Sequence, residues 1–405
     1  MRAYLPALVA LMLRAPVSIQ AQSAPPQSVL PPPARADGLK TASAEAAGLD
    51  TRRLAALTTA VRAWPELGVH AILIERSGRL VYEEYFDGFD EHWGTPRGRV
   101  SMAPDSLHDL RSVTKSVVSA LAGLALADGA IESLDQPVVD WFPEYPELNT
   151  AAGRRLTLRH VLGMTSGLAW DENVPYSDPR NDEIGMTRDR QPLRYVLSRA
   201  STRDAGAEFN YNGGLVQVMA AVIQRAVKMP IQEYARTKLF APLGIDTVEW
   251  VGDLAGMPNA ASGLRLRARD LAKFGSLYLH GGRWNGRPVL PADWVELSTR
   301  RQFRFPSAPE RDRTVSHAEA DGAFGYAYFW WYSCYPTPRG LVEARTAVGN
   351  GQQRIFVLPG LDMVVTILAG RYNDFTTGNT LGTRILREHV LPAVRSGFRA
   401  GCSGA

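Results

Sequence analysis

Hydrophobic and polar positions follow two different periods along this chain, and they predict strands near both ends with helices between them. Residues 70–86 and 353–369 each contain two apolar runs separated by a turn signal, Ser77-Gly78 in the first and Pro359-Gly360 in the second. Each pair is typical of a β-hairpin. Residues 112–250 are mostly helical in pattern, although 171–190 are polar and without period.

Two further segments, residues 45–63 and 383–394, have apolar positions at helical spacing. Strands at both chain ends, with helices beside and between them, predict an α/β (α+β) fold. We expect one antiparallel sheet built from both chain ends, flanked by helices, with an inserted helical lobe.

The composition is that of an ordinary globular protein. The chain has 405 residues, of which 45% are hydrophobic and 21% are charged. Its formal net charge is only +4, so nucleic acid or an anionic membrane is not expected as the main partner. After the first residues, no segment reaches the roughly 18 apolar residues that span a bilayer, so no stable membrane insertion is expected.

The N-terminus resembles a secretory signal peptide. In residues 1–24, Arg2 precedes an apolar run, Leu5 to Leu13, and small residues follow it. The alternative is an apolar tail on a cytosolic protein. Residues 25–44 are predicted as a proline-rich spacer. We expect a periplasmic or secreted protein, in which Cys334 and Cys402 could pair or remain free.

Ser112-Val113-Thr114-Lys115 is the candidate catalytic motif. It opens a run of small and apolar residues that ends at Asp128-Gly129, so Ser112 is expected at the start of a helix and Lys115 one turn later, on the same face. A serine hydroxyl needs a neighbouring base, and burial with nearby positive charge would lower the pKa of a lysine enough to make it one. The alternative is a helix-capping serine beside a solvated lysine.

Three segments in order carry a family resemblance: SVTKSVVSALAGLALADGAIESLDQPVVDWFPE, LTLRHVLGMTSGL and GLRLRARDLAKFGSLYLHGGRWNG. They resemble the class C β-lactamase-related serine hydrolases, which include esterases, D-amino-acid peptidases and 6-aminohexanoate-dimer hydrolase. The resemblance implies a β-lactamase/transpeptidase-like domain over residues 45–398. Its sheet lobe would comprise 45–110 and 255–398, and its helical lobe 111–254.

The resemblance also implies a tyrosine that relays the proton with the lysine. Tyr211, in Phe209-Asn210-Tyr211-Asn212-Gly213, occupies that place, although the family usually has its asparagine two positions after the tyrosine. Tyr211 could instead be a core residue. Asn212 could bind substrate or cap the following helix.

The family's third element is a Lys-Thr-Gly or His-x-Gly triplet on an edge strand. Ala347-Val348-Gly349 stands there, without a cation or hydroxyl for a substrate carboxylate, which puts β-lactam and D-Ala-D-Ala substrates in doubt. By resemblance, the backbone N–H groups of Ser112 and Asn350 would form the oxyanion hole. Gly349 could instead mark a β-bulge.

Some residues around the site have two readings. Tyr176 lies in the long polar segment where relatives carry substrate contacts, or it belongs to a solvated loop. Phe329-Trp330-Trp331 could line an acyl pocket or belong to the core. The seven histidines show no metal-ligand spacing and there is no phosphate-loop motif, so neither a metal nor a nucleotide cofactor is expected.

The predicted function is a serine hydrolase that acts on small ester or amide substrates through an acyl-enzyme on Ser112, most like a carboxylesterase. Two alternatives stay open. One is a D-aminopeptidase or amide-oligomer hydrolase of the same fold, and the other is a penicillin-binding-like sensor that does not turn over. The sequence does not indicate an oligomeric state.

Overall fold

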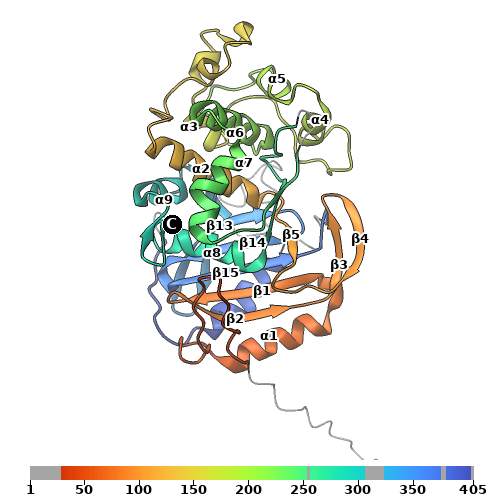
Figure 1. The fold of residues 1–405 in the computed structure, drawn as a ribbon, viewed down its shortest axis with the longest axis vertical. Helices are drawn as coiled ribbons and strands as arrows, with labels where there is room; N and C mark the ends of the chain where they lie inside the picture. The colour runs from red at the N-terminus through yellow and green to blue at the C-terminus, as the bar shows by residue number, and fades with distance from the viewer. Residues whose placement is uncertain (1–28, 253–255, 306–322, 375–379, 403–405) are drawn as a thin grey trace, which may run out of the picture.

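The computed structural model describes residues 29–252, 256–305, 323–374 and 380–402. Its centre is an eight-stranded antiparallel sheet with the strand order β10-β11-β12-β13-β14-β15-β1-β2 (Figure 1). The strands span, in that order, Phe303–Arg304, Ala323–Tyr326, Trp331–Thr337, Gly340–Gly349, Gln353–Leu358, Met363–Ala369, Val69–Arg76 and Arg79–Tyr85. Because β15 pairs with β1, the sheet is built from both chain ends, as the hydrophobic pattern predicted.

Helices cover both faces of this sheet. Helix α1 (Thr51–Ala63) and the closing helices lie on one face, and α8 (Ala268–Leu279) lies on the other. The closing helices are three short consecutive segments, Leu381–Arg384, Ile385–Val390 and Leu391–Ala393. The side chains of β15 alternate between two cores. Val364 and Leu368 join the core shared with α8, whereas Val365 and Ile367 join the core under α1.

A glycine permits the close contact between α8 and the sheet. A Cβ atom on Gly275 would lie 2.6 Å from a methyl group of Val364 and 2.8 Å from one of Ile355. The helix backbone therefore packs directly on strands β14 and β15.

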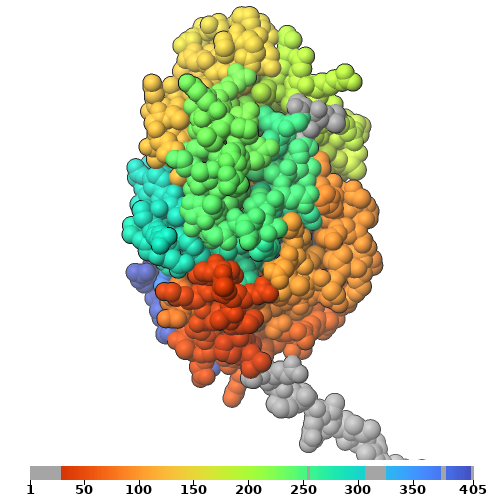
Figure 2. Space-filling model, viewed as in Figure 1, coloured from red at the N-terminus to blue at the C-terminus, as the bar shows by residue number. Residues whose placement is uncertain are grey.

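The helical lobe lies above the sheet in the view of Figures 1 and 2, where its residues are yellow to green and the N-terminal strands are red to orange. Its helices are α2 (Val113–Ala127), α3 (Leu158–Leu162), α4 (Asp182–Arg188), α5 (Pro192–Leu197), α6 (Gly213–Val227) and α7 (Ile231–Ala235). No helix within the described ranges is both long and apolar enough to cross a bilayer.

Three small sheets accompany the large one. β5 (Leu107–Asp109), β7 (Leu264–Arg267) and β6 (Glu249–Trp250) form a three-stranded sheet, while β3 (Gly88–His92) pairs with β4 (Thr95–Val100). A ribbon of β8 (Arg283–Trp284) and β9 (Arg287–Pro288) precedes α9 (Ala292–Thr299). β5 leads directly into α2, so the start of α2 is anchored where the lobes meet.

Element boundaries differ from the sequence pattern in three places. The first helix begins at Thr51, not near residue 45, because the side chain of Asp50 accepts hydrogen bonds from the N–H groups of Arg52 and Arg53. The closing helix is partly a π-helix, over Ile385–Val390. The polar segment 171–190 is not only a loop, since it contains α4.

The N-terminal segments have a mixed outcome. The predicted signal peptide, 1–24, lies outside the described residues. Within the predicted spacer, Leu39 and Ala44 are buried, and Asp37 forms an ion pair with Arg269. The later part of the spacer therefore packs on the domain.

Cys334 and Cys402 form a disulfide, with their Cα atoms 6.2 Å apart. It links β12 to the C-terminal tail. Of the two readings that the sequence left open, the structure has the paired one.

Candidate active site

The Ser112 and Lys115 side chains meet at the start of α2. The Lys115 Nζ atom lies 3.0 Å from the Ser112 Oγ atom and donates a second hydrogen bond to the carbonyl oxygen of Ala261, at 2.9 Å. Lys115 is only 1% exposed, whereas Ser112 is partly exposed. The Ser112 hydroxyl makes no capping bond to the helix backbone. The alternative of a capping serine beside a solvated lysine therefore does not describe this site.

The segment before α2 fixes the position of Ser112. Arg111 has a φ of +49°, a left-handed conformation that is uncommon for a non-glycine residue and turns the chain from β5 into the helix. Asp109, at the end of β5, is held by the guanidinium of Arg265 at 2.6 Å. The hydroxyl of Ser112 is thus presented by a turn that is anchored on its N-terminal side.

Tyr211 faces both residues from the loop before α6. Its ring centroid lies 5.0 Å from the Lys115 Nζ atom, and its ring stacks on Trp331 at 5.6 Å. Burial raises the pKa of the Tyr211 phenol, although the Lys115 charge and a hydrogen bond with Ser112 act in the opposite direction. The three residues that the sequence selected are therefore in contact with one another.

A buried carboxyl pair, Glu172 and Glu183, lies next to Lys115. The Glu183 Oε2 atom is 3.9 Å from the Lys115 Nζ atom, and its Oε1 atom accepts a hydrogen bond from the Ser262 hydroxyl at 2.9 Å. Glu172 accepts hydrogen bonds from the Trp170 indole and the Gly213 N–H group. Both residues are 4% exposed.

The pKa values of the two carboxyl groups shift in opposite directions. Burial and the neighbouring charge of Glu183 raise the pKa of Glu172 well above its usual range. For Glu183, burial also acts to raise the pKa, but the charge of Lys115 and hydrogen bonds with Glu172 and Ser262 together outweigh it, and the pKa is lowered. We therefore assign the proton to Glu172, which donates it to Glu183, and the negative charge to Glu183.

This pair reverses the expected electrostatics of Lys115. The sequence argument expected burial and positive surroundings to lower the pKa of Lys115. Burial does act in that direction, but Tyr211, Glu183 and Glu172 outweigh it, so the pKa is raised. In the resting protein Lys115 is therefore an ammonium group paired with the Glu183 carboxylate.

The predicted oxyanion strand lies beside Ser112. A Cβ atom on Gly349, the last residue of β13, would lie 2.3 Å from the carbonyl oxygen of Leu110, so β13 approaches the turn before Ser112 at backbone distance. Asn350 follows, and its side chain exchanges hydrogen bonds with Asn373, both at 2.8 Å.

Of the other candidate residues, Asn212 caps a helix and Tyr176 lies near the site. Asn212 is 1% exposed, and its side-chain oxygen accepts a hydrogen bond from the Leu215 N–H group at 3.1 Å, so it caps α6. Tyr176 is partly exposed, and burial together with the nearby groups Glu183, Glu172 and Tyr211 raises the pKa of its phenol. Tyr176 therefore lies within electrostatic range of the site.

The aromatic run in β12 and the preceding turn is divided between core and site. Trp330 is fully buried and packs on Tyr278, with ring centroids 4.5 Å apart. The Phe329 carbonyl oxygen accepts a hydrogen bond from the Ser116 hydroxyl at 2.7 Å. Only Trp331 reaches the site, through its stacking on Tyr211.

Comparisons with known proteins agree with this arrangement. A family model described as Beta-lactamase matches residues 59–387. The 6-aminohexanoate-dimer hydrolase of Paenarthrobacter ureafaciens is 28% identical over 310 residues, which are 74% of this chain and 72% of that protein.

Two solved structures show the same fold. EstCE1, described as a hydrolase with promiscuous acyltransferase activity, has a TM-score of 0.62 at 17% identity, over 85% of this chain and 98% of that one. A class C β-lactamase has a TM-score of 0.60 at 13% identity, over 85% of this chain and 96% of that one. The match to the family model covers most of the chain, so the protein belongs to the β-lactamase family and is a hydrolase of the serine type.

Proposed function

We propose that this protein hydrolyses small neutral esters, and secondarily amides, through an acyl-enzyme on Ser112. The observation that carries the proposal is the 3.0 Å contact between the Lys115 Nζ atom and the Ser112 Oγ atom, inside a site where Lys115 is buried. A hydroxyl at this distance from an amine can lose its proton as it attacks a carbonyl carbon.

In the proposed reaction the Ser112 oxygen bonds to the carbonyl carbon while its proton passes to Lys115 and Tyr211. The carbonyl oxygen becomes an oxyanion, which the N–H groups of Ser112 and Asn350 would stabilise. The bond to the leaving group then breaks, and the leaving group takes the proton. Water attacks the acyl-enzyme in the same way, which releases the acid and restores the Ser112 hydroxyl.

Lys115 has to be neutral to accept that proton. Its ammonium form is stabilised by Glu183, so activity should rise with pH as the ammonium loses its proton. Tyr211, which hydrogen bonds with Ser112, is placed to carry the proton towards the leaving group. The carboxyl pair does not touch the substrate in this scheme and acts through Lys115.

The preference for neutral substrates rests on the triplet Ala347-Val348-Gly349, which has no cation or hydroxyl for a substrate carboxylate. An amide-oligomer hydrolase is the second candidate, because the relative from Paenarthrobacter ureafaciens is named for that activity. A sensor that is acylated but not deacylated is the third candidate, and it differs in a measurable way.

The test is hydrolysis of p-nitrophenyl butyrate by the purified protein and by Ser112→Ala. We expect the variant to lose nearly all turnover, while Ser133→Ala, in the turn after the same helix, keeps it. Equal turnover by Ser112→Ala and the wild type would exclude Ser112 as the nucleophile. Intact mass spectrometry distinguishes the sensor, which would keep a stable adduct on Ser112 without releasing acid.

We also propose export to the periplasm or the medium. The predicted signal peptide and the Cys334–Cys402 disulfide support it, because disulfides persist in oxidising compartments. N-terminal sequencing of the protein from its natural host should find a start after Ala21 or Ala24. A chain that still begins at Met1 would contradict the proposal.

A further inference from the structure

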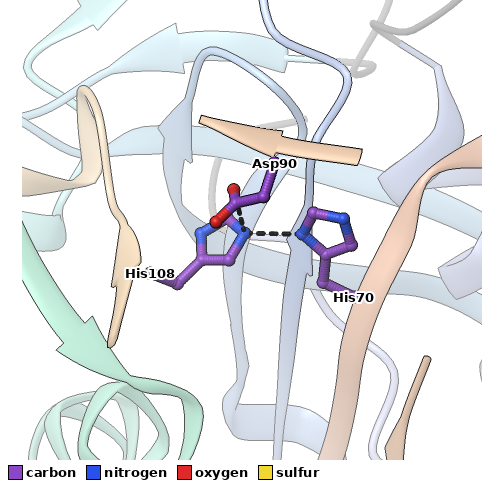
Figure 3. Close-up of side chains that lie close together, drawn as sticks. All are labelled: His70, Asp90 and His108. Carbon is purple, nitrogen blue, oxygen red and sulfur yellow. Dashed lines mark hydrogen bonds and ion pairs between the residues drawn. The ribbon is translucent and has the colours of Figure 1, made fainter. Parts of the chain in front are cut away.

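A buried cluster of two histidines and an aspartate takes no part in the proposed reaction. His70 comes from β1, Asp90 from β3 and His108 from β5, so three strands distant in sequence meet there. Figure 3 shows one ring nitrogen of His108 directed at both of the other side chains. The His108 Nε2 atom is 2.8 Å from the His70 Nδ1 atom and 3.7 Å from the Asp90 Oδ1 atom.

The hydrogen bonds around the cluster fix the tautomer of His108. The His108 Nδ1 atom lies 2.9 Å from the carbonyl oxygen of Asp109, which can only accept, so this nitrogen carries the hydrogen. In a neutral imidazole the Nε2 atom then has a lone pair, which accepts a hydrogen bond from the His70 Nδ1 atom at 2.8 Å, while the Asp90 carboxylate lies 3.7 Å away. Asp90 is also paired with the Arg97 guanidinium at 3.4 Å. A metal ion at this point would replace the hydrogen bond between the two histidines and take the Nε2 lone pair and a carboxylate oxygen as ligands.

We propose that His70, Asp90 and His108 form a binding site for a divalent transition-metal ion, with Zn²⁺ as the expected occupant. One ligand atom from each residue lies within 4.8 Å of the other two. Two imidazole nitrogens and one carboxylate oxygen are a common donor set for zinc, with a fourth position taken by water or another oxygen. The site holds three protein ligands, and the Tyr372 hydroxyl lies next to it.

The distances between ligand atoms fit a small ion after modest side-chain movement. Zinc–ligand bonds of about 2.0–2.1 Å in a tetrahedron place the ligand atoms about 3.3 Å apart. The two imidazoles would have to separate from 2.8 Å, and Asp90 would have to approach His108 from 3.7 Å. Both movements are about half an ångström, and the ligand atoms of His70 and Asp90, which lie within 4.8 Å of each other, would have to close to the same spacing.

The surroundings of the cluster resemble the outer contacts of a metal site. The Asp109 carbonyl fixes the tautomer of His108, and the Tyr372 hydroxyl donates to the Asp90 Oδ1 atom at 3.2 Å.

The second histidine has a place for its hydrogen when the metal is bound. Without a metal, the His70 Nδ1 atom donates to His108 and its Nε2 atom is a buried group with no hydrogen-bond partner. With a metal on Nδ1, the hydrogen moves to Nε2, which lies near the Phe89 carbonyl oxygen: a Cβ atom on Gly370 would lie 3.0 Å from the former and 2.1 Å from the latter. Metal binding therefore removes a buried acceptor that has no donor.

The experiment uses the full chain without a histidine tag. The protein is treated with a chelator, incubated with Zn²⁺, passed through a desalting column and analysed for bound metal. We expect one zinc per chain and a higher melting temperature with zinc than without it. Asp90→Asn, which keeps the size of the side chain, should weaken zinc affinity at least tenfold, whereas His389→Gln, outside the cluster, should leave it unchanged.

Two results would overturn the proposal. The wild type could retain no zinc and show no change in melting temperature, which would make the cluster a hydrogen-bonded network only. Alternatively, Asp90→Asn could bind zinc as tightly as the wild type, which would place the bound metal elsewhere. Neither measurement depends on hydrolysis, so failure of the metal site and failure of the proposed ester hydrolysis are distinguishable.

Discussion

Replacement of Glu183 by glutamine tests whether the carboxyl pair sets the charge of Lys115. Glu183 is the ionised member of the pair, and its Oε2 atom lies 3.9 Å from the Lys115 Nζ atom. Glutamine keeps the side chain's size and an oxygen that can accept from Ser262. The substitution therefore removes one negative charge with little change in packing.

The magnitude follows from the distance. Two unit charges about 4 Å apart interact by about 4 kcal/mol at an effective dielectric constant of about 20, and about 1.4 kcal/mol corresponds to a tenfold change in an equilibrium. Because the lost charge stabilised the ammonium form, the pKa of Lys115 falls in Glu183→Gln. The acidic limb of the kcat/KM profile for a neutral ester should move to lower pH by between about 1 and 3 pH units.

The lower end of that range applies if Glu172 ionises in the variant. Its pKa is raised by burial and by the charge of Glu183, and only the second cause disappears. The double variant Glu172→Gln/Glu183→Gln excludes this compensation and should give the larger displacement. The plateau rate should fall in both variants, because a less basic amine is a weaker proton acceptor.

Glu172→Gln alone is the matched control. Its oxygen can still accept from Trp170 and Gly213, its amide can donate to Glu183, and the charge on Glu183 remains. The profile of this variant should move to lower pH by less than that of Glu183→Gln, because Glu183 keeps its charge and contributes more than Glu172 to the raised pKa of Lys115. A profile that is the same in Glu183→Gln and the wild type would refute the assignment of Lys115 as the group that must lose its proton.

Three further substitutions test other parts of the structure. Tyr211→Phe keeps the stacking on Trp331 and removes the hydroxyl, so kcat should fall by about 10²–10⁴-fold while the melting temperature is kept; an unchanged kcat would remove Tyr211 from the proton relay. Gly213→Ala places a Cβ atom 2.7 Å from the Glu183 Oε2 atom, so chemical denaturation should show a free energy of unfolding lower by about 1–3 kcal/mol. In the control Gly252→Ala the nearest contact of the new Cβ atom is at 3.5 Å, so the free energy of unfolding should change little. Cys334→Ser opens a link across 68 residues and should lower the free energy of unfolding by up to about 4 kcal/mol; reductant should lower the stability of the wild type to that of the variant and leave the variant unaffected.

The sequence predicts the parts of this molecule that depend on local pattern. The hairpins at both ends follow from alternating or continuous apolar runs with turn residues between them, and their pairing into one sheet is confirmed. Ser112 and Lys115 are three residues apart on a helix, so their contact follows from helix geometry alone. Tyr211 could be selected only through its order relative to the other segments of the family.

The electrostatics of the site could not be predicted in the same way. Glu183 lies 68 residues from Lys115, in a polar segment that reads as a loop, and no periodicity marks it as buried. Without Glu183, the expected direction of the Lys115 pKa was wrong. His70 and His108 show the same limit, because 38 residues separate them and only the pairing of strands brings them together.

Charge pairing around Ser112 leads to a prediction about substrates. Lys115 is paired with Glu183, and Arg111 is paired with Glu91 and with Asp109, the latter at 3.2 Å. The cations on either side of Ser112 in the sequence therefore already have carboxylate partners, and the triplet Ala347-Val348-Gly349 adds none. A substrate carboxylate would lose its hydration without gaining a charge-assisted hydrogen bond, a contribution of about 1.5–3 kcal/mol.

We expect kcat/KM for p-nitrophenyl butyrate to exceed that for an analogue with a carboxylate at the end of the acyl chain by at least about tenfold. The ratio should persist at high salt, because it arises from a missing contact and not from a long-range field; an anionic ester hydrolysed as fast as the neutral one would show that a free cation faces the acyl group.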